Sequence, residues 1–322
     1  MIDIFGQTET GEAVQIITLQ AGDLTARILT LGATLQSVRL SGVAYDLTHG
    51  SDRISDYLGQ MQYHGSLIGP VVNRLSHAAA PIDGKVHQFE VNYNGRHTLH
   101  SGTAGTQGKV WAILAHDPQS CTLGLTLAAG EGGFPGTRQI AVTFAIAAPA
   151  SLTMTLQVST DAPTLINFAN HSYWNLDGSP SWAGHQLQIA AEAVLPCDAD
   201  FKPTGEIRPV AGTSMDFRQP RAISPGAPEL DNCFVLSADR MALRDVLWLT
   251  GTSGVTMTVA TTEPGVQVYD GRGAQRPGRQ PFEGIAVECQ GWPDAPNHPA
   301  FPQITVRPGT PVSQVTQWRF SR

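Results

Sequence analysis

Residues 140–158, IAVTFAIAAPASLTMTLQV, decide the fold class of this chain. Apolar side chains occupy every second position on both sides of an AAPAS turn: Ile140, Val142, Phe144 and Ile146 before it, and Leu152, Met154, Leu156 and Val158 after it. Successive side chains of a strand point to opposite faces, so this period of two predicts an antiparallel hairpin with one buried face.

Three further stretches predict the same kind of element. Residues 24–40, LTARILTLGATLQSVRL, predict two strands that are broken at Gly32. The sequence PIDGKVHQFEV places Asp83-Gly84, a preferred two-residue hairpin turn, between two short strands. The sequence VLWLTGTSGVTMTVATT predicts a hairpin that turns around Gly251 and Gly254.

Helix signals are few. RISDYLGQM, near residues 53–61, is the best helix candidate, whereas ADRMALRDVLWL, near 238–249, is interpreted as a turn followed by a strand. No Ser/Gly-rich or charge-rich linker and no internal repeat divides the 322 residues. We therefore predict one all-β domain, residues 1–322, built as a large antiparallel sandwich or its extended form with few short helices.

Composition limits the partners that the chain can have. Its 33 Gly and 22 Pro suit short strands joined by tight turns. A net charge of −7 argues against a nucleic-acid or anionic-membrane surface. The opening MIDIFGQTETGEAVQ lacks the basic and apolar regions of a secretion signal, so we expect a cytoplasmic protein. Four widely spaced cysteines fit reduced, mostly buried thiols: Cys121, Cys197, Cys233 and Cys289.

Glu288 is the strongest physical indication of a site. It interrupts the apolar strand GIAVEC, where an isolated ionised carboxylate would be costly to bury. A carboxylate in such a place is usually paired, or it points into a cleft with a raised pKa and acts as a base. A structural Glu288 with satisfied hydrogen bonds is the competing interpretation.

Two short segments that contain an arginine or histidines also stand out. Asn73-Arg74 follow an apolar run, where an arginine either clamps sugar hydroxyls or forms a salt bridge at a strand end. HTLHSG holds His97 and His100. Such a pair could be a metal half-site, a hydrogen-bonding pair or, most commonly, two surface histidines.

Two further stretches combine polar and apolar residues. NFANHSYWNLDG, residues 167–178, crowds amides, an imidazole and aromatic rings together, which suits either a sugar site or an amide-rich turn with inward aromatic rings. Asp231 and Asn232 directly precede the apolar strand CFVL. A carboxylate there could accept hydrogen bonds from vicinal hydroxyls or cap a turn.

Taken together and in this order, these groups of residues resemble the aldose 1-epimerase (galactose mutarotase) family from about residue 65 to the C-terminus. The resemblance is carried by NRLS, PIDGKVHQFEVNYNGRHTLHSG, NHSYWNL, PTGEIRPVAGTSMDF, LDNCFVL, TTEPGVQVYDG and PDAPNHPAFPQITVRPG. It implies a β-supersandwich with a shallow sugar cleft. It also implies an isomerase that interconverts the α and β anomers of a free monosaccharide without metal or cofactor.

The same resemblance implies roles for individual residues. Glu288 falls on the general base at the anomeric O1 hydroxyl, and His171 falls on the general acid at the ring oxygen O5. His100 would assist at O5, while Arg74 and Asp231 would hold sugar hydroxyls. The other expected substrate contacts come from the same motifs: Asn73, Asn170, Tyr173 and Trp174.

Three positions depart from the family pattern. Gly69-Pro70 stands where Gly-Arg usually precedes the Asn-Arg pair. Ser101 replaces the first glycine of the usual L-H-G-G motif, and Trp174 replaces a phenylalanine. The sequence therefore leaves the preferred aldose open. It also leaves open whether the protein is a monomer or a homodimer.

The segment DGRGAQRPGRQPFEG adds Arg272, Arg276 and Arg279 with no acid between them. A solvated loop is the simpler interpretation, and an anion site for a phosphorylated sugar is the alternative. The competing functions are thus a hexose-6-phosphate mutarotase and a sugar-binding or sugar-sensing module without turnover. A metallohydrolase has little support, because no pair like that of H-E-x-x-H is present.

Overall fold

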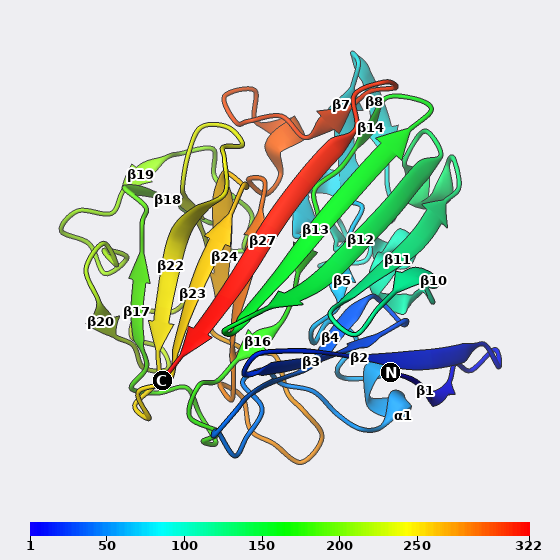
Figure 1. Cartoon of the computed structure of the whole chain (residues 1–322). Helices are drawn as coiled ribbons and strands as arrows, with labels where there is room; N and C mark the ends of the chain where they lie inside the picture. The colour runs from blue at the N-terminus through cyan, green and yellow to red at the C-terminus, as the bar shows by residue number, and fades with distance from the viewer.

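The computed structural model describes all 322 residues, and nearly every element in it is an antiparallel strand. The largest sheet has nine strands, and in Figure 1 the C-terminal strand β27 runs through it between β13 and β23. In order across this sheet the strands are β10 (Ala112–His116), β11 (Ser120–Leu127), β12 (Arg138–Ala147), β13 (Ser151–Thr160), β27 (Val312–Ser321), β23 (Thr256–Thr261), β22 (Arg244–Thr250), β17 (Gln186–Ile189) and β20 (Arg221–Ala222).

Two smaller sheets complete the main framework. The four-stranded sheet near the N-terminus lies below the right-hand part of the large sheet in Figure 1. Its strands are β1 (Ile2–Gln7), β2 (Ala13–Ala21), β3 (Leu24–Leu29) and β4 (Thr34–Leu40). The six-stranded sheet has the order β16 (Tyr173–Trp174), β25 (Ile285–Gln290), β24 (Gly265–Tyr269), β21 (Asp231–Val235), β18 (Ala193–Leu195) and β19 (Arg208–Pro209).

Short elements fill the connections between these sheets. There is one α-helix, α1 (Ile54–Tyr57), together with five 3₁₀ turns. The paired short strands are β5 (Leu67–Ile68) with β15 (Ala169–Asn170), β6 (Arg74–Leu75) with β9 (Thr98–Leu99), β7 (Ala79–Ile82) with β8 (Lys85–Gln88), and β14 (Thr164–Leu165) with β26 (Thr305–Val306).

The alternation in residues 140–158 produces the β12–β13 hairpin. Ile140 pairs with Val158, and Phe144 pairs with Met154. Their side chains are buried on the inner face of the large sheet and belong to one core of 53 buried residues, which also takes in residues of the other two sheets. Strand β25 departs from this alternation, because every one of its residues is buried.

The structure confirms the predicted all-β class and the predicted hairpins. Residues 24–40 form β3 and β4, Asp83-Gly84 joins β7 to β8, and the hairpin at 246–262 is β22–β23. The interpretation of 238–249 as a turn followed by a strand is also confirmed. The helix expected near 53–61 is much shorter, since α1 ends after four residues and turns follow it.

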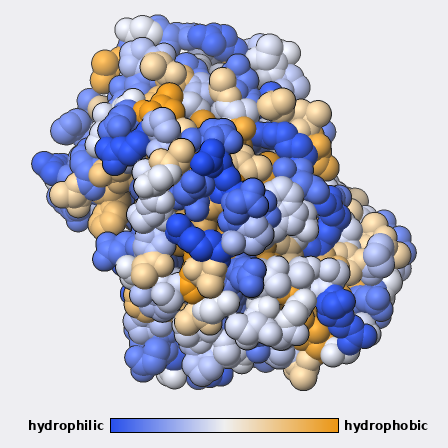
Figure 2. Space-filling view, turned by 90° about the vertical axis from the view of Figure 1, so that its left-hand side faces the viewer, coloured by the Kyte–Doolittle hydropathy of each residue, from blue (hydrophilic) through white to orange (hydrophobic).

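The surface shows no broad apolar area on the side that carries β17–β20. Figure 2 shows that face as mostly hydrophilic or neutral, with hydrophobic residues in small separate groups. None of the helices has the length and apolar character required to span a lipid bilayer. All four cysteines are free thiols, and Cys197 alone is partly exposed.

Candidate active site

A pocket of about 460 Å³ opens on the six-stranded sheet. Its wall is contributed by β16, β25, β24 and β21 of that sheet and by the turns around β6 and β9. Seven of the nine site residues expected from the sequence line it: Asn73, Arg74, His100, His171, Tyr173, Asp231 and Glu288.

The register of the sheet brings two carboxylates to one face. Glu288 of β25 lies opposite Gln267 of β24, and Tyr269 of β24 lies opposite Asp231 of β21. Directly paired residues share a face of a sheet, and so do residues two apart along a strand. Glu288 and Asp231 therefore point to the same side, where the pocket lies.

His171 and Glu288 face each other in this pocket. Nε2 of His171 lies 3.5 Å from Oε1 of Glu288, and both residues are at least 95 % buried. Neither Nδ1 of His171 nor Oε2 of Glu288 has a hydrogen-bond partner within the protein. Such unsatisfied buried atoms are costly unless a ligand supplies the missing hydrogen bonds.

Burial disfavours the charged form of both groups. It lowers the pKa of His171 to about 4. It also raises the pKa of Glu288 well above the usual carboxyl range, and the nearby Asp231 carboxylate raises it further while Arg74 acts in the opposite direction. Opposed shifts in adjacent titratable groups are typical of acid–base sites.

The tautomer of His100 is fixed by the backbone. Nδ1 of His100 accepts a hydrogen bond from the backbone N–H of Asn73 at 3.2 Å, so the neutral ring carries its proton on Nε2. Desolvation lowers the pKa of His100 well below its usual value, with His171 and Arg74 acting in the same direction. His100 is thus suited to donate a hydrogen bond as a neutral ring.

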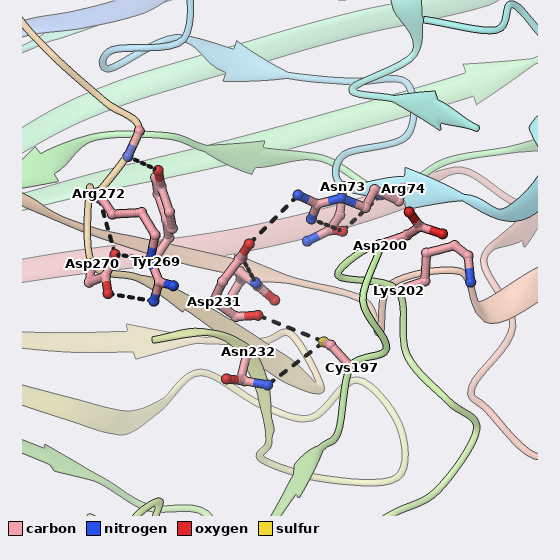
Figure 3. A network of polar contacts seen from close by, with 12 residues as sticks. Asn73, Arg74, Cys197, Asp200, Lys202, Asp231, Asn232, Tyr269, Asp270 and Arg272 are labelled. Carbon is pink, nitrogen blue, oxygen red and sulfur yellow. Dashed lines mark hydrogen bonds and ion pairs between the residues drawn. The ribbon is translucent and has the colours of Figure 1, made fainter. Parts of the chain in front are cut away.

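Arg74 and Asp231 form the polar wall beside this pair. Figure 3 shows Arg74 pointing toward Asp231, with Nη2 of the arginine 3.6 Å from Oδ2 of the carboxylate. Oδ1 of Asp231 accepts a hydrogen bond from Gln267 Nε2 at 2.7 Å. Both side chains keep hydrogen-bonding capacity that sugar hydroxyls could use.

Gln267 was missed by the sequence reasoning, although it gives the same signal as Glu288. It is a polar residue within the apolar strand GVQVY, and it is 3 % exposed. Four aromatic residues that line the pocket were missed as well: Tyr63, Tyr93, Phe201 and Tyr269. No sequence signal pointed to Tyr63, whose ring centroid lies 4.8 Å from that of His100.

Two of the expected substrate contacts do not line the pocket. Trp174 is completely buried, and its ring packs against Trp318 and Phe320 in the core, because adjacent residues of β16 face opposite sides. Asn170 donates from Nδ2 to the carbonyl oxygen of Gly65 at 2.7 Å. Asn170 therefore fixes the turn that carries His171.

His97 is not the surface residue that its sequence context favoured. Its side chain is fully buried, and Nδ1 accepts a hydrogen bond from the backbone N–H of His77 at 2.9 Å. Nε2 lies 3.4 Å from Asp200. No group of three or more His, Cys, Asp or Glu side chains is arranged to hold a metal ion.

Arg272 lies at the pocket wall but is occupied by two carboxylates. It binds Asp270 through two hydrogen bonds, of 3.0 and 2.7 Å, as Figure 3 shows, and its Nη1 donates to Glu229 at 2.9 Å. Asp270 is fully buried. These contacts neutralise the guanidinium charge that an anionic sugar would need.

Arg276 and Arg279 are turned toward a third carboxylate. Arg276 forms a two-pronged contact with Glu283, which is 6 % exposed, and donates from Nη1 to the carbonyl oxygen of Gly50 at 2.8 Å. Arg279 lies 3.7 Å from the same carboxylate. Neither arginine lines the pocket.

The two arginines should differ sharply when they are neutralised. Arg276→Gln should lower the free energy of unfolding by about 2–3 kcal/mol, because it leaves the buried Glu283 without its main partner. Arg279→Gln, at a side chain that is 58 % exposed, should change it by less than about 0.5 kcal/mol. Urea unfolding of both variants tests this, and equal effects would contradict the assigned roles.

The fold and the site define a class: an all-β protein whose pocket brings an imidazole and a carboxylate together. Comparison with known proteins agrees. A family model described as aldose 1-epimerase matches residues 15–319. Galactose mutarotase from Bos taurus is 31 % identical, over 99 % of this chain and 97 % of its own length. Aldose 1-epimerase from Escherichia coli (strain K12) is 30 % identical, over 96 % of each chain.

Solved structures of known proteins have a similar fold. An aldose epimerase homologue from C. elegans has a TM-score of 0.89 at 28 % identity, covering 96 % of this chain and 99 % of its own. Galactose 1-epimerase from Lactobacillus acidophilus NCFM has a TM-score of 0.86 at 24 % identity, covering 100 % and 98 %. The chain belongs to the aldose 1-epimerase family and is an isomerase.

Proposed function

We propose that this protein is a mutarotase of unphosphorylated aldoses, in which Glu288 is the general base and His171 the general acid. The observation that carries the proposal is the facing pair, 3.5 Å apart and open to one pocket. The names of the Bos taurus and Escherichia coli relatives, galactose mutarotase and aldose 1-epimerase, support it. The carboxylate partners of Arg272 favour a neutral sugar over a sugar phosphate.

The reaction follows from where the two groups place a proton. The Glu288 carboxylate takes the proton of the O1 hydroxyl, the C1–O5 bond breaks with its electron pair on O5, and His171 gives its proton to O5. The sugar is now the open-chain aldehyde. Rotation about C1–C2 turns the other carbonyl face toward O5, and the reverse proton movements close the opposite anomer. Acid and base acting together contribute roughly 10²–10⁴-fold for each group.

The hydrogen bond from Asn73 to His100 separates the roles of the two imidazoles. A cationic His100 would lose the backbone hydrogen bond that its Nδ1 accepts, whereas Nδ1 of His171 has no such partner to lose. His171 is therefore the ring that can carry the additional proton. His100 donates a hydrogen bond to O5 from Nε2, and Arg74 and Asp231 hold ring hydroxyls.

The catalytic cycle needs one dissociable proton in total on the two side chains, Glu288 and His171. With the closed ring bound, the proton is on His171, and with the open chain bound it is on Glu288. The opposed pKa shifts place it on Glu288 in the empty site. Binding of the cyclic sugar, whose hydroxyls solvate the charged form, moves this proton to His171 across the pair.

Activity should therefore be constant over a broad range around neutral pH. On the acid side kcat/KM should fall near pH 4, as the pair takes up a second proton on His171. On the alkaline side it should fall only well above the ordinary carboxyl pKa, as Glu288 loses the last proton. A pH profile from polarimetry tests this, and an acid limb near pH 6.5, as for an exposed histidine, would contradict it.

The function itself is tested by following anomer interconversion of freshly dissolved α-glucose, α-galactose, xylose, arabinose and fucose. We expect at least one of them to equilibrate faster than in buffer, with and without a chelator. Two-dimensional exchange NMR gives an independent rate. Sugar binding without acceleration of any aldose would instead favour a binding module, and loss of activity on chelation would require a metal.

A further inference from the structure

The donors of Arg74 are largely unused. Its Nη1 reaches Asn73 Oδ1 at 3.4 Å and its Nη2 reaches Asp231 at 3.6 Å, both long contacts. Nε is buried and has no partner, and the residue is 9 % exposed. A guanidinium has five N–H donors, so an arginine buried to this extent needs partners that the protein does not supply. The pocket is where a ligand would supply them.

Two aromatic rings hold this guanidinium. Its Cζ lies 4.8 Å from the ring centroid of Tyr93 and 5.4 Å from that of Phe201. We call these two rings the aromatic clamp, and both line the pocket. Rings attract a cation without using its N–H donors, so the clamp fixes the position of Arg74 and leaves the donors free for hydroxyls.

Phe201 is held in the clamp against its backbone preference. Its φ is 57°, in the left-handed region that is unfavourable for a phenylalanine, and the residue is 37 % exposed. Asp198 accepts a hydrogen bond from the backbone N–H of Lys202 at 3.2 Å and binds Lys202 Nζ at 2.5 Å. These contacts close the turn around Phe201 from both sides.

A second anchor ties this turn to the loop that carries Tyr93. Asp200 accepts a hydrogen bond from Asn94 Nδ2 at 2.9 Å and contacts the guanidinium of Arg96. Figure 3 shows Asp200 and Lys202 on the segment that runs past Arg74. A backbone conformation of this kind persists only where its surroundings impose it, and such residues concentrate at ligand-binding sites.

The order of strands places the clamp far from the acid–base pair. Glu288 is on β25, and Asp231 is on β21, two strands further along the sheet. Since neighbouring strands are about 4.8 Å apart, this separates the two strands by roughly 10 Å. The turn with Phe201 follows β18, on the other side of β21. C1 and O5 must lie at Glu288 and His171, so the clamp faces the sugar carbons remote from C1.

We propose that Tyr93 and Phe201 determine which aldose is accepted, by positioning Arg74 and by packing on the C–H groups at the end of the sugar remote from C1. Aromatic faces suit C–H surfaces, and the adjacent guanidinium suits the hydroxyls. This inference rests on the proposed mutarotase function.

The test compares sugars that differ at either end of the ring. Glucose, galactose and xylose differ at C4 or C5, whereas glucose and mannose differ at C2. In Phe201→Asn and Tyr93→Leu, KM should rise about five- to tenfold with kcat within about twofold. The ratios of kcat/KM among glucose, galactose and xylose should change at least threefold, while the glucose-to-mannose ratio stays constant.

Several comparisons separate this role from a structural one. Asparagine tolerates the left-handed conformation, so Phe201→Asn should keep the Tm or raise it, whereas loss of a packing residue would lower it. Phe201→Tyr keeps the ring and should keep the wild-type KM. Ile207→Asn and Val91→Asn remove apolar side chains that are 44 % and 51 % exposed and lie outside the pocket, so their KM should be unchanged.

Sugar Kd measured by calorimetry in the Glu288→Gln background makes the test independent of turnover. A five- to tenfold weaker Kd on adding Phe201→Asn supports the inference. The inference is overturned if sugar binds equally tightly with and without Phe201. It is also overturned if the glucose-to-mannose ratio of kcat/KM changes as much as the ratios among glucose, galactose and xylose. Either result leaves the mutarotase proposal intact. If no sugar binds, the proposed function fails and the clamp fails with it.

Discussion

Glu288→Gln is expected to lower kcat by about 10³-fold or more while changing sugar Kd by less than about threefold. Glutamine keeps the shape of the side chain and can still hydrogen-bond to O1, but it has no basic oxygen to receive the proton. Oε2 of Glu288 and Nδ1 of His171 have no partner within the protein, which favours the proposed role of this carboxylate over a structural one. The change should therefore affect the transition state far more than binding.

The chain contains a matched control for this experiment. Glu263 is also a fully buried carboxylate, but it binds Arg240 and Gln314 and lies outside the pocket. Glu263→Gln should lower the Tm and leave turnover per folded molecule intact. If Glu288→Gln behaves in that way, with near-wild-type kcat, Glu288 is a structural residue and the proposed mechanism is wrong.

Much of the fold and part of the site could be predicted from local patterns. The alternation in 140–158 predicts the central hairpin, and the polar interruption of GIAVEC indicates Glu288. The facing of His171 and Glu288 could not be predicted from the residues alone, because it depends on how β16 pairs with β25. The resemblance to a known family supplied that link.

The errors at the site have physical causes that the sequence partly contains. Tyr173 and Trp174 are adjacent in one strand, so only one of them can face the pocket, and alternation could have excluded Trp174. The arginine-rich segment has no acid between its arginines, yet its partners Asp270 and Glu283 flank it. Phe201 gave no signal, because its place beside Arg74 depends on contacts between distant segments, such as those of the adjacent Asp200 with Asn94 and Arg96 about a hundred residues earlier.

His171→Asn should also lower kcat, by about 10²–10³-fold, because O5 then leaves without its proton donor. The acid limb of the pH profile near pH 4 should disappear, since the group that titrates there is gone. His185 offers the matched control, as a fully buried histidine whose Nε2 accepts a hydrogen bond from Leu176 outside the pocket. His185→Asn should lower the Tm and keep both kcat and the shape of the pH profile.

The double variant Glu288→Gln/His171→Asn gives the sharpest result. If the two groups stabilised the transition state independently of each other, their losses in kcat would multiply to about 10⁵–10⁶-fold. We propose instead that they act as a unit, because Glu288 takes the O1 proton while His171 gives its own proton to O5. Once either group is absent the other has little left to contribute, so the double loss should stay within about tenfold of the larger single loss. Losses that multiply fully would show that protonation of O5 and deprotonation of O1 are independent events, and the shared-proton cycle would then have to be abandoned.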